Sequence, residues 1–295
     1  MNKGYTILGY FMLLVTAIVW GSAFVAQRHG MSSLGPFGFN GIRMLVGWLT
    51  LSCVIGSITM FGNGGGGKGS RDTLITAGLL CGIVLGLASV VQQIGIKYTS
   101  VGKAGFISTL YIILVPALGI LFGQKNRLVT WLCVFLALFG FFLISNFKPG
   151  TDFNRGDLYC LACAILFSAH ILLISHFAPK VDPLHLAAFQ FLVSGILSLV
   201  ILPFTSESFP TLSNIRSAAL PILYAGILSS GVAYTFQVIA QKWVRPVAAS
   251  LIMSLESCFA ALFGWLLLQE RLSTREIAGC IVIFVAVIIT TVKGE

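Results

Sequence analysis

Glu256 is the side chain whose position in this sequence is most unusual for chemistry. It lies near the middle of an apolar stretch over residues 246–268, and we expect the other eight acidic residues in loops or near the C-terminal end. A charge at the centre of a bilayer costs about 2.5–3.5 kcal/mol on insertion scales. The position therefore predicts that Glu256 binds a substrate amine or accepts a coupling proton. The alternative is a buried ion pair with Arg43 that holds two helices in register.

Two further ionisable residues lie within apolar stretches and could act with this carboxylate. Arg43 lies in the stretch 37–60, and its planar guanidinium suits a substrate carboxylate. Snorkelling to the membrane interface or pairing with an acid are alternatives of similar weight. His170 lies in the stretch 156–177 and could relay protons near neutral pH, although we favour a packing role for it. An amino-acid-like solute could use Arg43 and Glu256 together.

The remaining candidate binding residues are amides and aromatic side chains within the apolar stretches. They are Gln92, Gln237, Tyr111, Trp20 and Tyr234, with Phe24 and Trp265 as further possible walls of an apolar pocket. Hydrogen bonding between helices is an equally good explanation of the two amides. The four histidines do not have the spacing of metal ligands, so we expect no metal and no cofactor.

These residues lie on ten apolar stretches, each long enough, or nearly so, to cross a bilayer as a helix. Of the 295 residues, 57% are apolar and only 9% are charged, which is too little polar surface for a soluble particle. The alternation of a membrane barrel is absent, so the chain is expected to be an all-α integral membrane protein. The expected spans are 5–27, 37–60, 73–96, 103–123, 128–146, 156–177, 183–204, 218–240, 246–268 and 274–292.

The two halves of the chain repeat one another at an offset of about 145 residues. Gln92 corresponds to Gln237 and Tyr111 corresponds to Glu256. Five spans in each half place the second half upside down relative to the first, as in many solute transporters. The sequence thus predicts two inverted five-helix repeats, over residues 1–147 and 154–293.

Glycine and proline indicate how the spans are joined and packed. Pro36 and Pro183 suit the first turn of a helix. The glycine-rich segment 62–71 reads as a flexible tether, and 148–155 as the hinge between the halves. Glycines at four-residue spacing predict close approach by another helix: Gly78, Gly82 and Gly86 in one span, and Gly119 and Gly123 in the next.

The charges and cysteines exclude several classes of protein. The net charge is +9, but the cations are scattered over the loops without a basic stripe, so nucleic acid is not an expected partner. Nine loop cations on one side against eight on the other do not determine the orientation. The seven cysteines lie in apolar stretches and imply no disulfide framework.

Three segments resemble the ten-span EamA-type transporters of the drug/metabolite transporter superfamily. They are Val19–Phe24 (VWGSAF), Phe39–Arg43 (FNGIR) and Ser254–Ser273, which contains LES and ERL. The resemblance implies a cavity between the halves, termini in the cytoplasm, and export of small metabolites or amino acids. Where the family has a proline after the glutamate, this chain has Ser257, so we expect a straighter ninth span.

We therefore predict a secondary transporter of small organic solutes that exports by alternating access in a bacterial inner or plasma membrane. Coupling to protons through Glu256 and exchange without protons are both open. The expected partners are the solute, membrane lipid and coupling protons. A flippase for lipid-linked carriers with the same fold is an alternative. A membrane enzyme is disfavoured because a single acid within the spans does not make a catalytic cluster, and we predict that the protein is not an enzyme.

Overall fold

The computed structural model describes residues 3–61, 70–99, 101–121, 123–124, 126–145, 154–268 and 273–293. These residues form helices and short connections, and they contain no strand. Nine helical segments in this part of the chain are long and apolar enough to cross a membrane, and a tenth, Leu128–Ile144, is slightly shorter. The expected tether 62–71 and hinge 148–155 lie largely outside the described residues.

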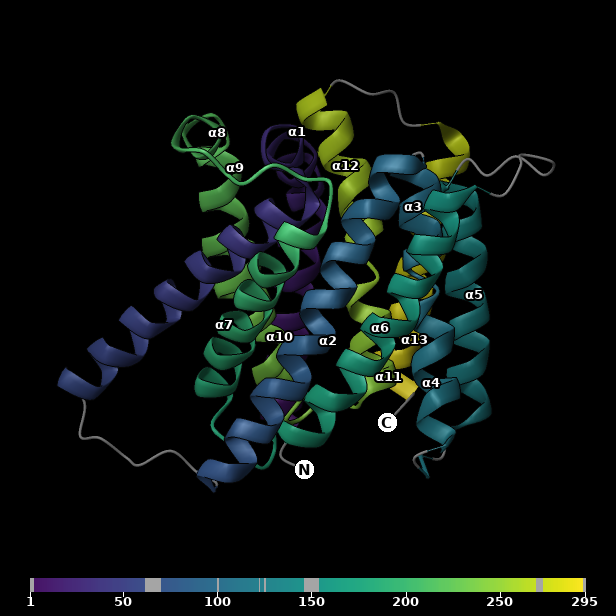
Figure 1. Cartoon of the computed structure of the whole chain (residues 1–295). Coiled ribbons are helices and arrows are strands. Elements are labelled where there is room, and N and C mark those ends of the chain that lie inside the picture. Colours follow the sequence, from purple (N-terminus) through teal and green to yellow (C-terminus); the bar gives the residue numbers. More distant parts are fainter. Residues whose placement is uncertain are drawn as a thin grey trace.

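The helices of the two repeats alternate in direction along one bundle (Figure 1). The first repeat comprises α1 (Lys3–Phe61), α2 (Arg71–Tyr98), α3 (Val101–Ser108), α4 (Tyr111–Leu121) and α5 (Leu128–Ile144). The second comprises α6 (Arg155–Phe177), α7 (Pro183–Ile201), η1 (Leu202–Phe204), α8 (Leu212–Ser217), α9 (Ala219–Leu223), η2 (Tyr224–Tyr234), α10 (Thr235–Ala240), α11 (Pro246–Met253), α12 (Glu256–Leu268) and α13 (Thr274–Lys293). Both termini emerge at the same end of the bundle, as an even number of crossings requires. The predicted all-α membrane fold is confirmed.

Helix α1 supplies the first two spans, and its turn is tighter than the sequence predicts. We expected a connection over residues 28–36, but helix continues almost to Gly35, where the chain reverses direction. Gly35 has φ +71°, a conformation that costs little only for glycine. Pro36 follows at once and begins the second span, as expected from its fixed φ.

Close packing between α2 and α7 joins the two repeats. A Cβ on Gly82 would lie 2.8 Å from the carbonyl oxygen of Gln190, so only glycine permits this approach. Gly78 and Gly86 face α7 in the same way, which confirms the predicted seam. The prediction for the next span is wrong: Gly119 faces the side chain of Gln124, and Gly123 lies beyond the end of α4.

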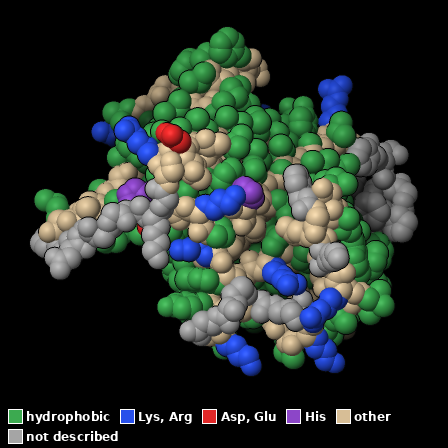
Figure 2. All heavy atoms as spheres, turned by 90° about the horizontal axis from the view of Figure 1, so that it is seen from below, with side chains coloured by type: hydrophobic (Ala, Val, Ile, Leu, Met, Phe, Trp, Pro, Cys, Tyr) green, Lys and Arg blue, Asp and Glu red, His purple; other side chains and the backbone are tan. Residues whose placement is uncertain are grey.

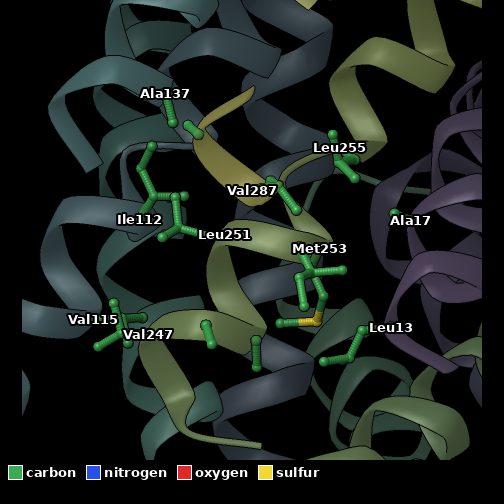
Figure 3. Packing of buried hydrophobic residues seen from close by; sticks show 14 of the residues in the cluster. Leu13, Ala17, Ile112, Val115, Ala137, Val247, Leu251, Met253, Leu255 and Val287 are labelled. Carbon is green, nitrogen blue, oxygen red and sulfur yellow. The ribbon is translucent and has the colours of Figure 1, made fainter. Parts of the chain in front are cut away.

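The largest hydrophobic cluster surrounds the half-helices α4 and α11 (Figure 3). Its members come from both repeats and include Leu13, Ile112, Val115, Ala137, Leu251 and Val287. Burying a large aliphatic side chain contributes about 1.5–3 kcal/mol. This cluster therefore fixes the two half-helices, which lead to the predicted site residues Tyr111 and Glu256.

Apolar side chains also cover the outside of the bundle. The C-terminal half of α1 exposes large apolar side chains, as expected for contact with lipid. The exposed fractions are 53% for Leu49, 55% for Ile58 and 83% for Met60. Figure 2 views the end that carries the termini, where Lys and Arg side chains are scattered among neutral and apolar groups. Such a dispersed set suits lipid headgroups rather than a polyanion.

Candidate functional site

A partly open cavity lies between the two repeats, and about 540 Å³ of empty space lies in and around it, including space open to solvent. It is lined by residues of α1, α2, α4, α6, η2, α10, α11 and α12, so both repeats contribute. The lining residues are Trp20, Phe24, Gln27, Arg43, Gln92, Tyr111, Phe167, His170, Ile171, Ser229, Tyr234, Gln237, Met253 and Glu256. The structure thus brings all eight candidate binding residues of the sequence around one space.

Interrupted helices place Tyr111 and Glu256 at equivalent points of the two repeats. Tyr111 begins α4 after the turn that ends α3, and Glu256 begins α12 after the turn that ends α11. In each turn a hydroxyl bonds to a carbonyl of the preceding helix: Thr109 Oγ1 donates to Gly105, and Ser254 Oγ donates to Leu251 at 2.6 Å. Discontinuous membrane helices are where repeat-built transporters hold substrates and ions.

The ninth span, which we expected to be straighter, has a break in its regular α-helical hydrogen bonding between α11 and α12. Ser257 replaces the usual proline, yet the helix is still interrupted. Leu255 N–H donates to the carbonyl oxygen of Ile252 at 3.1 Å and Ser257 N–H donates to that of Ser254 at 3.2 Å, so both bonds span three residues instead of four. Side-chain hydroxyls that bond to nearby carbonyls compete with regular helix in this way. The Glu256 carboxylate consequently lies in the first turn of α12, where the helix dipole favours negative charge.

Arg43 is buried and held by a chain of hydrogen bonds behind the cavity wall. Its Nε donates to Asn40 Oδ1 at 3.1 Å, and Asn40 Nδ2 donates to Ser198 Oγ at 2.9 Å. Ser198 Oγ in turn donates to the carbonyl oxygen of Ser194 at 2.9 Å. No other hydrogen bond to Arg43 is formed in the described part of the chain. Arg43 lines the cavity, and the two terminal nitrogens of its guanidinium have no hydrogen-bond partner among the described residues.

Arg43 and Glu256 do not form the ion pair that the alternative interpretation requires. Among the described residues, no carboxylate oxygen lies within 4.0 Å of the Arg43 guanidinium. Glu256 is partly exposed, next to Tyr111, and both charged residues line the cavity. The expectation that Glu256 is the only acid within a span is wrong, because Asp157 is fully buried in the first turn of α6. It accepts a hydrogen bond from Thr99 Oγ1 at 2.8 Å and does not line the cavity.

An 11-residue π-helical segment, η2, carries part of the aromatic wall. Trp20 Nε1 donates to the carbonyl oxygen of Ser229 at 3.3 Å, and Thr16 Oγ1 donates to that of Ala233 at 2.9 Å. These bonds from α1 satisfy carbonyls of the widened helix. The rings of Trp20 and Tyr234 lie 4.5 Å apart between centroids, which forms an aromatic surface beside the charged residues.

His170 and the two repeat-related amides complete the polar lining. His170 Nε2 lies 3.0 Å from Gln190 Oε1, while its Nδ1 is buried without a partner among the described groups. Gln237 Nε2 donates to Gln241 Oε1 at 3.1 Å. Gln92 has no side-chain hydrogen bond in the described part of the chain, so the structure does not use it to join helices.

Sequence reasoning missed several lining residues and misplaced one. Gln27, Phe167, Ile171, Ser229 and Met253 also line the cavity. Gln27 could have been identified from the sequence, since it is an amide at the C-terminal end of the expected span 5–27. The others are ordinary packing residues by type. Trp265, which we considered as a wall of the pocket, is 49% exposed and does not line it.

The described residues contain no group of three or more His, Cys, Asp or Glu side chains that could hold a metal ion. The cavity lining offers one guanidinium, one carboxyl, three amides, one imidazole and a set of aromatic rings. These groups can bind a carboxylate, an amine and an apolar side chain together.

Comparison with known proteins places this cavity in a family. The model of the EamA-like transporter family matches residues 7–146 and again residues 154–292. The chain belongs to the EamA-like transporter family. One similar protein, named an uncharacterized transporter, from Archaeoglobus fulgidus, is 31% identical over 284 residues, which cover 95% of this chain and 85% of that protein. The uncharacterized transporter YoaV of Bacillus subtilis is 21% identical over 95% of both chains.

A solved structure, named only "Crystal structure of protein", has the same fold as this EamA-like chain. It gives a TM-score of 0.76 at 18% identity and covers 100% of this chain and 98% of its own. The family match occurs twice, once in each five-span half, which agrees with a duplicated bundle. The protein is thus a multi-pass membrane protein of a transporter family.

The structure gives a physical reason for one residue of the EamA-like segment VWGSAF. Gly21 lies against α12, and a Cβ there would lie 2.7 Å from the carbonyl oxygen of Glu256. Glycine at this position lets α1 touch the backbone of the very turn that carries the carboxylate. The neighbouring Trp20 then reaches the cavity from the same helix.

Proposed function

We propose that the protein is a secondary transporter that carries a small zwitterionic solute, such as an amino acid, through the central cavity. Arg43 binds the carboxylate of the solute, Glu256 binds its ammonium group, and the rings of Trp20 and Tyr234 contact its apolar part. The observation that supports this most is that two opposite charges line one cavity without pairing. Each charge without its partner is costly in a membrane, and a zwitterion would neutralise both.

Alternating access by the two repeats is the proposed mechanism of transport. The interruptions before Tyr111 and Glu256 are natural hinges, because the backbone there is already released from regular helix. Glu256 can bind either a proton or the ammonium of the solute. We propose that this competition couples export of the solute to entry of a proton across the plasma membrane.

Thermal stability of the purified protein in detergent tests the binding step. A ligand that binds only the folded state raises the melting temperature by mass action. The probes are the twenty amino acids at pH 5.5 and pH 7.5, each compared with its N-acetyl and its amide derivative. The proposal expects at least one amino acid to stabilise the protein, with both derivatives weaker, since each lacks one charge.

The variants Glu256→Gln and Arg43→Met test the assignment of the two charges. A hydrogen bond to a charged group contributes about 1.5–3 kcal/mol, so each variant should weaken binding of the zwitterion roughly 10- to 150-fold. Glu256→Gln should also remove the difference between the two pH values. Asp72→Asn and Arg245→Met change exposed charges outside the cavity and serve as matched controls.

Uptake of the stabilising amino acid into proteoliposomes, with and without a pH gradient, tests the transport step. The proposal predicts that a pH gradient drives uptake of the amino acid and that Glu256→Gln abolishes this uptake. It would be refuted by zwitterion binding that neither cavity variant weakens. Lipid-headgroup scrambling in the same vesicles without solute uptake would support the flippase instead.

A further inference from the structure

The Gln237 amide lies at the end of a hydrogen-bond chain that fixes which of its atoms faces the cavity. Gln237 Nε2 donates to Gln241 Oε1 at 3.1 Å. Gln241 Nε2 donates to the carbonyl oxygen of Ile171 at 3.0 Å and to Ser175 Oγ at 2.8 Å. Gln237 and Gln241 are 1% and 3% exposed, so water does not replace these partners freely.

The donor and acceptor roles in this series of hydrogen bonds follow from the carbonyl group of Ile171, at its end. A backbone carbonyl can only accept a hydrogen bond, so Gln241 must turn its NH₂ group toward Ile171. Its Oε1 then faces Gln237, and only an N–H group of Gln237 can satisfy that oxygen. Gln237 lines the cavity and its NH₂ group is held by Gln241, which leaves Oε1 as the group it offers there. That oxygen has no hydrogen-bond partner among the described residues.

A second acceptor of the same kind lies nearby on α6. His170 Nε2 faces the amide oxygen of Gln190 at 3.0 Å, so in the neutral ring the proton lies on Nε2. The other nitrogen, Nδ1, is then an acceptor, and it is buried without a partner in the described part of the chain. His170 is next to Ile171, the residue that anchors Gln241, and its ring packs edge-on against Tyr234 at 6.2 Å. Tyr234 in turn lies one helical turn before Gln237.

We propose that the Gln237 end of the cavity selects solutes that carry a hydrogen-bond donor on the side chain, such as a hydroxyl, an amide or an indole N–H. Gln237 Oε1 accepts from this donor, and His170 Nδ1 is the acceptor for a second N–H where the solute has one, as an amide does. Gln241 is a positioning residue that holds the Gln237 amide in the accepting orientation. A buried acceptor left without a partner costs free energy, so a solute that lacks the donor binds more weakly. This inference deepens the zwitterion proposal and rests on the same cavity.

Pairs of probes that differ in a single donor measure the selection directly. Suitable pairs are L-tyrosine and L-phenylalanine, L-tryptophan and 1-methyl-L-tryptophan, and, without a carboxylate, tyramine and phenethylamine. Their affinities come from melting-temperature titrations of the full-length protein in detergent. The donor-bearing member of a pair should bind roughly 5- to 150-fold more tightly.

Four variants separate recognition from structure. Gln237→Met keeps the shape of the side chain and removes the acceptor, so it should abolish the donor preference while the donor-free member keeps its affinity. Gln241→Met should reduce the preference without touching the solute, because the Gln237 amide is then free to rotate. Gln237→Glu retains an acceptor and should preserve the preference. This variant keeps the inference testable if Gln237→Met does not fold. Gln124→Met, at an amide that does not line the cavity, is the matched control and should leave the preference intact.

The outcomes distinguish this inference from the zwitterion proposal. A preference that persists in Gln237→Met, or equal binding of both members of every pair to the wild-type protein, would overturn the inference alone. A donor preference for tyramine equal to that for L-tyrosine, with no gain from the carboxylate, would support the inference and contradict the zwitterion. Absence of binding by every probe would overturn both.

Discussion

Gly21 provides a stringent test of how α1 and α12 meet beside the carboxylate. In Gly21→Ala, the new Cβ would lie 2.6 Å from Phe259 Cβ, 2.7 Å from the Glu256 carbonyl oxygen and 2.8 Å from the Ala260 nitrogen. Two of these three atoms are backbone, so no side-chain rotation can relieve the contact. To bring the new Cβ and the Glu256 carbonyl oxygen to an ordinary van der Waals separation, α12 must move by roughly 0.7 Å.

The expected cost follows from overpacking of a close-packed interior. Insertion of an extra methyl group typically costs about 1–3 kcal/mol, and we expect Gly21→Ala to lower the free energy of unfolding by a similar amount. The displaced segment is the turn that carries Glu256, so solute affinity should fall as well. Unfolding in detergent and solute-dependent thermal stabilisation measure the two effects.

Gly56→Ala is the matched control, because a Cβ there meets nothing within 4 Å. Alanine is a better helix former than glycine by about 1 kcal/mol, so this variant should be neutral or slightly more stable. If Gly21→Ala unfolds and binds solute like Gly56→Ala, the close contact between α1 and α12 does not exist as described, and the reasoning is refuted.

Three further predictions concern the connections between spans. Gly35→Ala should destabilise the protein by about 1–2 kcal/mol because of its positive φ, which a comparison of melting temperature with Gly105→Ala would show. Partial burial raises the pKa of Glu207 despite hydrogen bonds from Phe37 and Gly38, so its contribution is most favourable at low pH and is lost as pH rises through the folded-state pKa. The melting temperature of Glu207→Gln relative to wild type should therefore rise between pH 4 and pH 7, and a fall would contradict this. Burial raises the pKa of Asp182, but hydrogen bonds from His185 and Leu184 outweigh it and lower the pKa. Asp182→Ala should thus cost about 1 kcal/mol at pH 7, and the cost should vanish as pH falls through the folded-state pKa; a pH-independent difference would count against it.

The sequence alone predicts the spans and the residues around the cavity well, because both follow from strong signals. Twenty apolar residues have few alternatives to a membrane helix, and a polar residue within one must face other protein or water. That reasoning located Arg43, Glu256 and the amides of both repeats. It could not separate Trp20, which lines the cavity, from Trp265, which is largely exposed, by residue type.

The local backbone around the site was less predictable. The interruption before Glu256 occurs without proline, through hydroxyl–carbonyl bonds that many serines in membrane helices form without breaking the helix. The π-helical segment Tyr224–Tyr234 depends on donors from α1, which are more than 200 residues away in sequence. Asp157 was misassigned because its burial depends on Thr99 at the end of another helix.

Accessibility of position 256 to water tests the central claim most directly. The protein with its seven cysteines replaced and a single cysteine introduced by Glu256→Cys is exposed to a charged, water-soluble methanethiosulfonate and to a lipid-soluble maleimide. A second protein that retains only Cys53, which is exposed on the C-terminal half of α1, is the lipid-facing control. We predict that the charged reagent modifies position 256 but not Cys53. Reaction of position 256 with the maleimide alone would contradict an aqueous cavity between the two repeats.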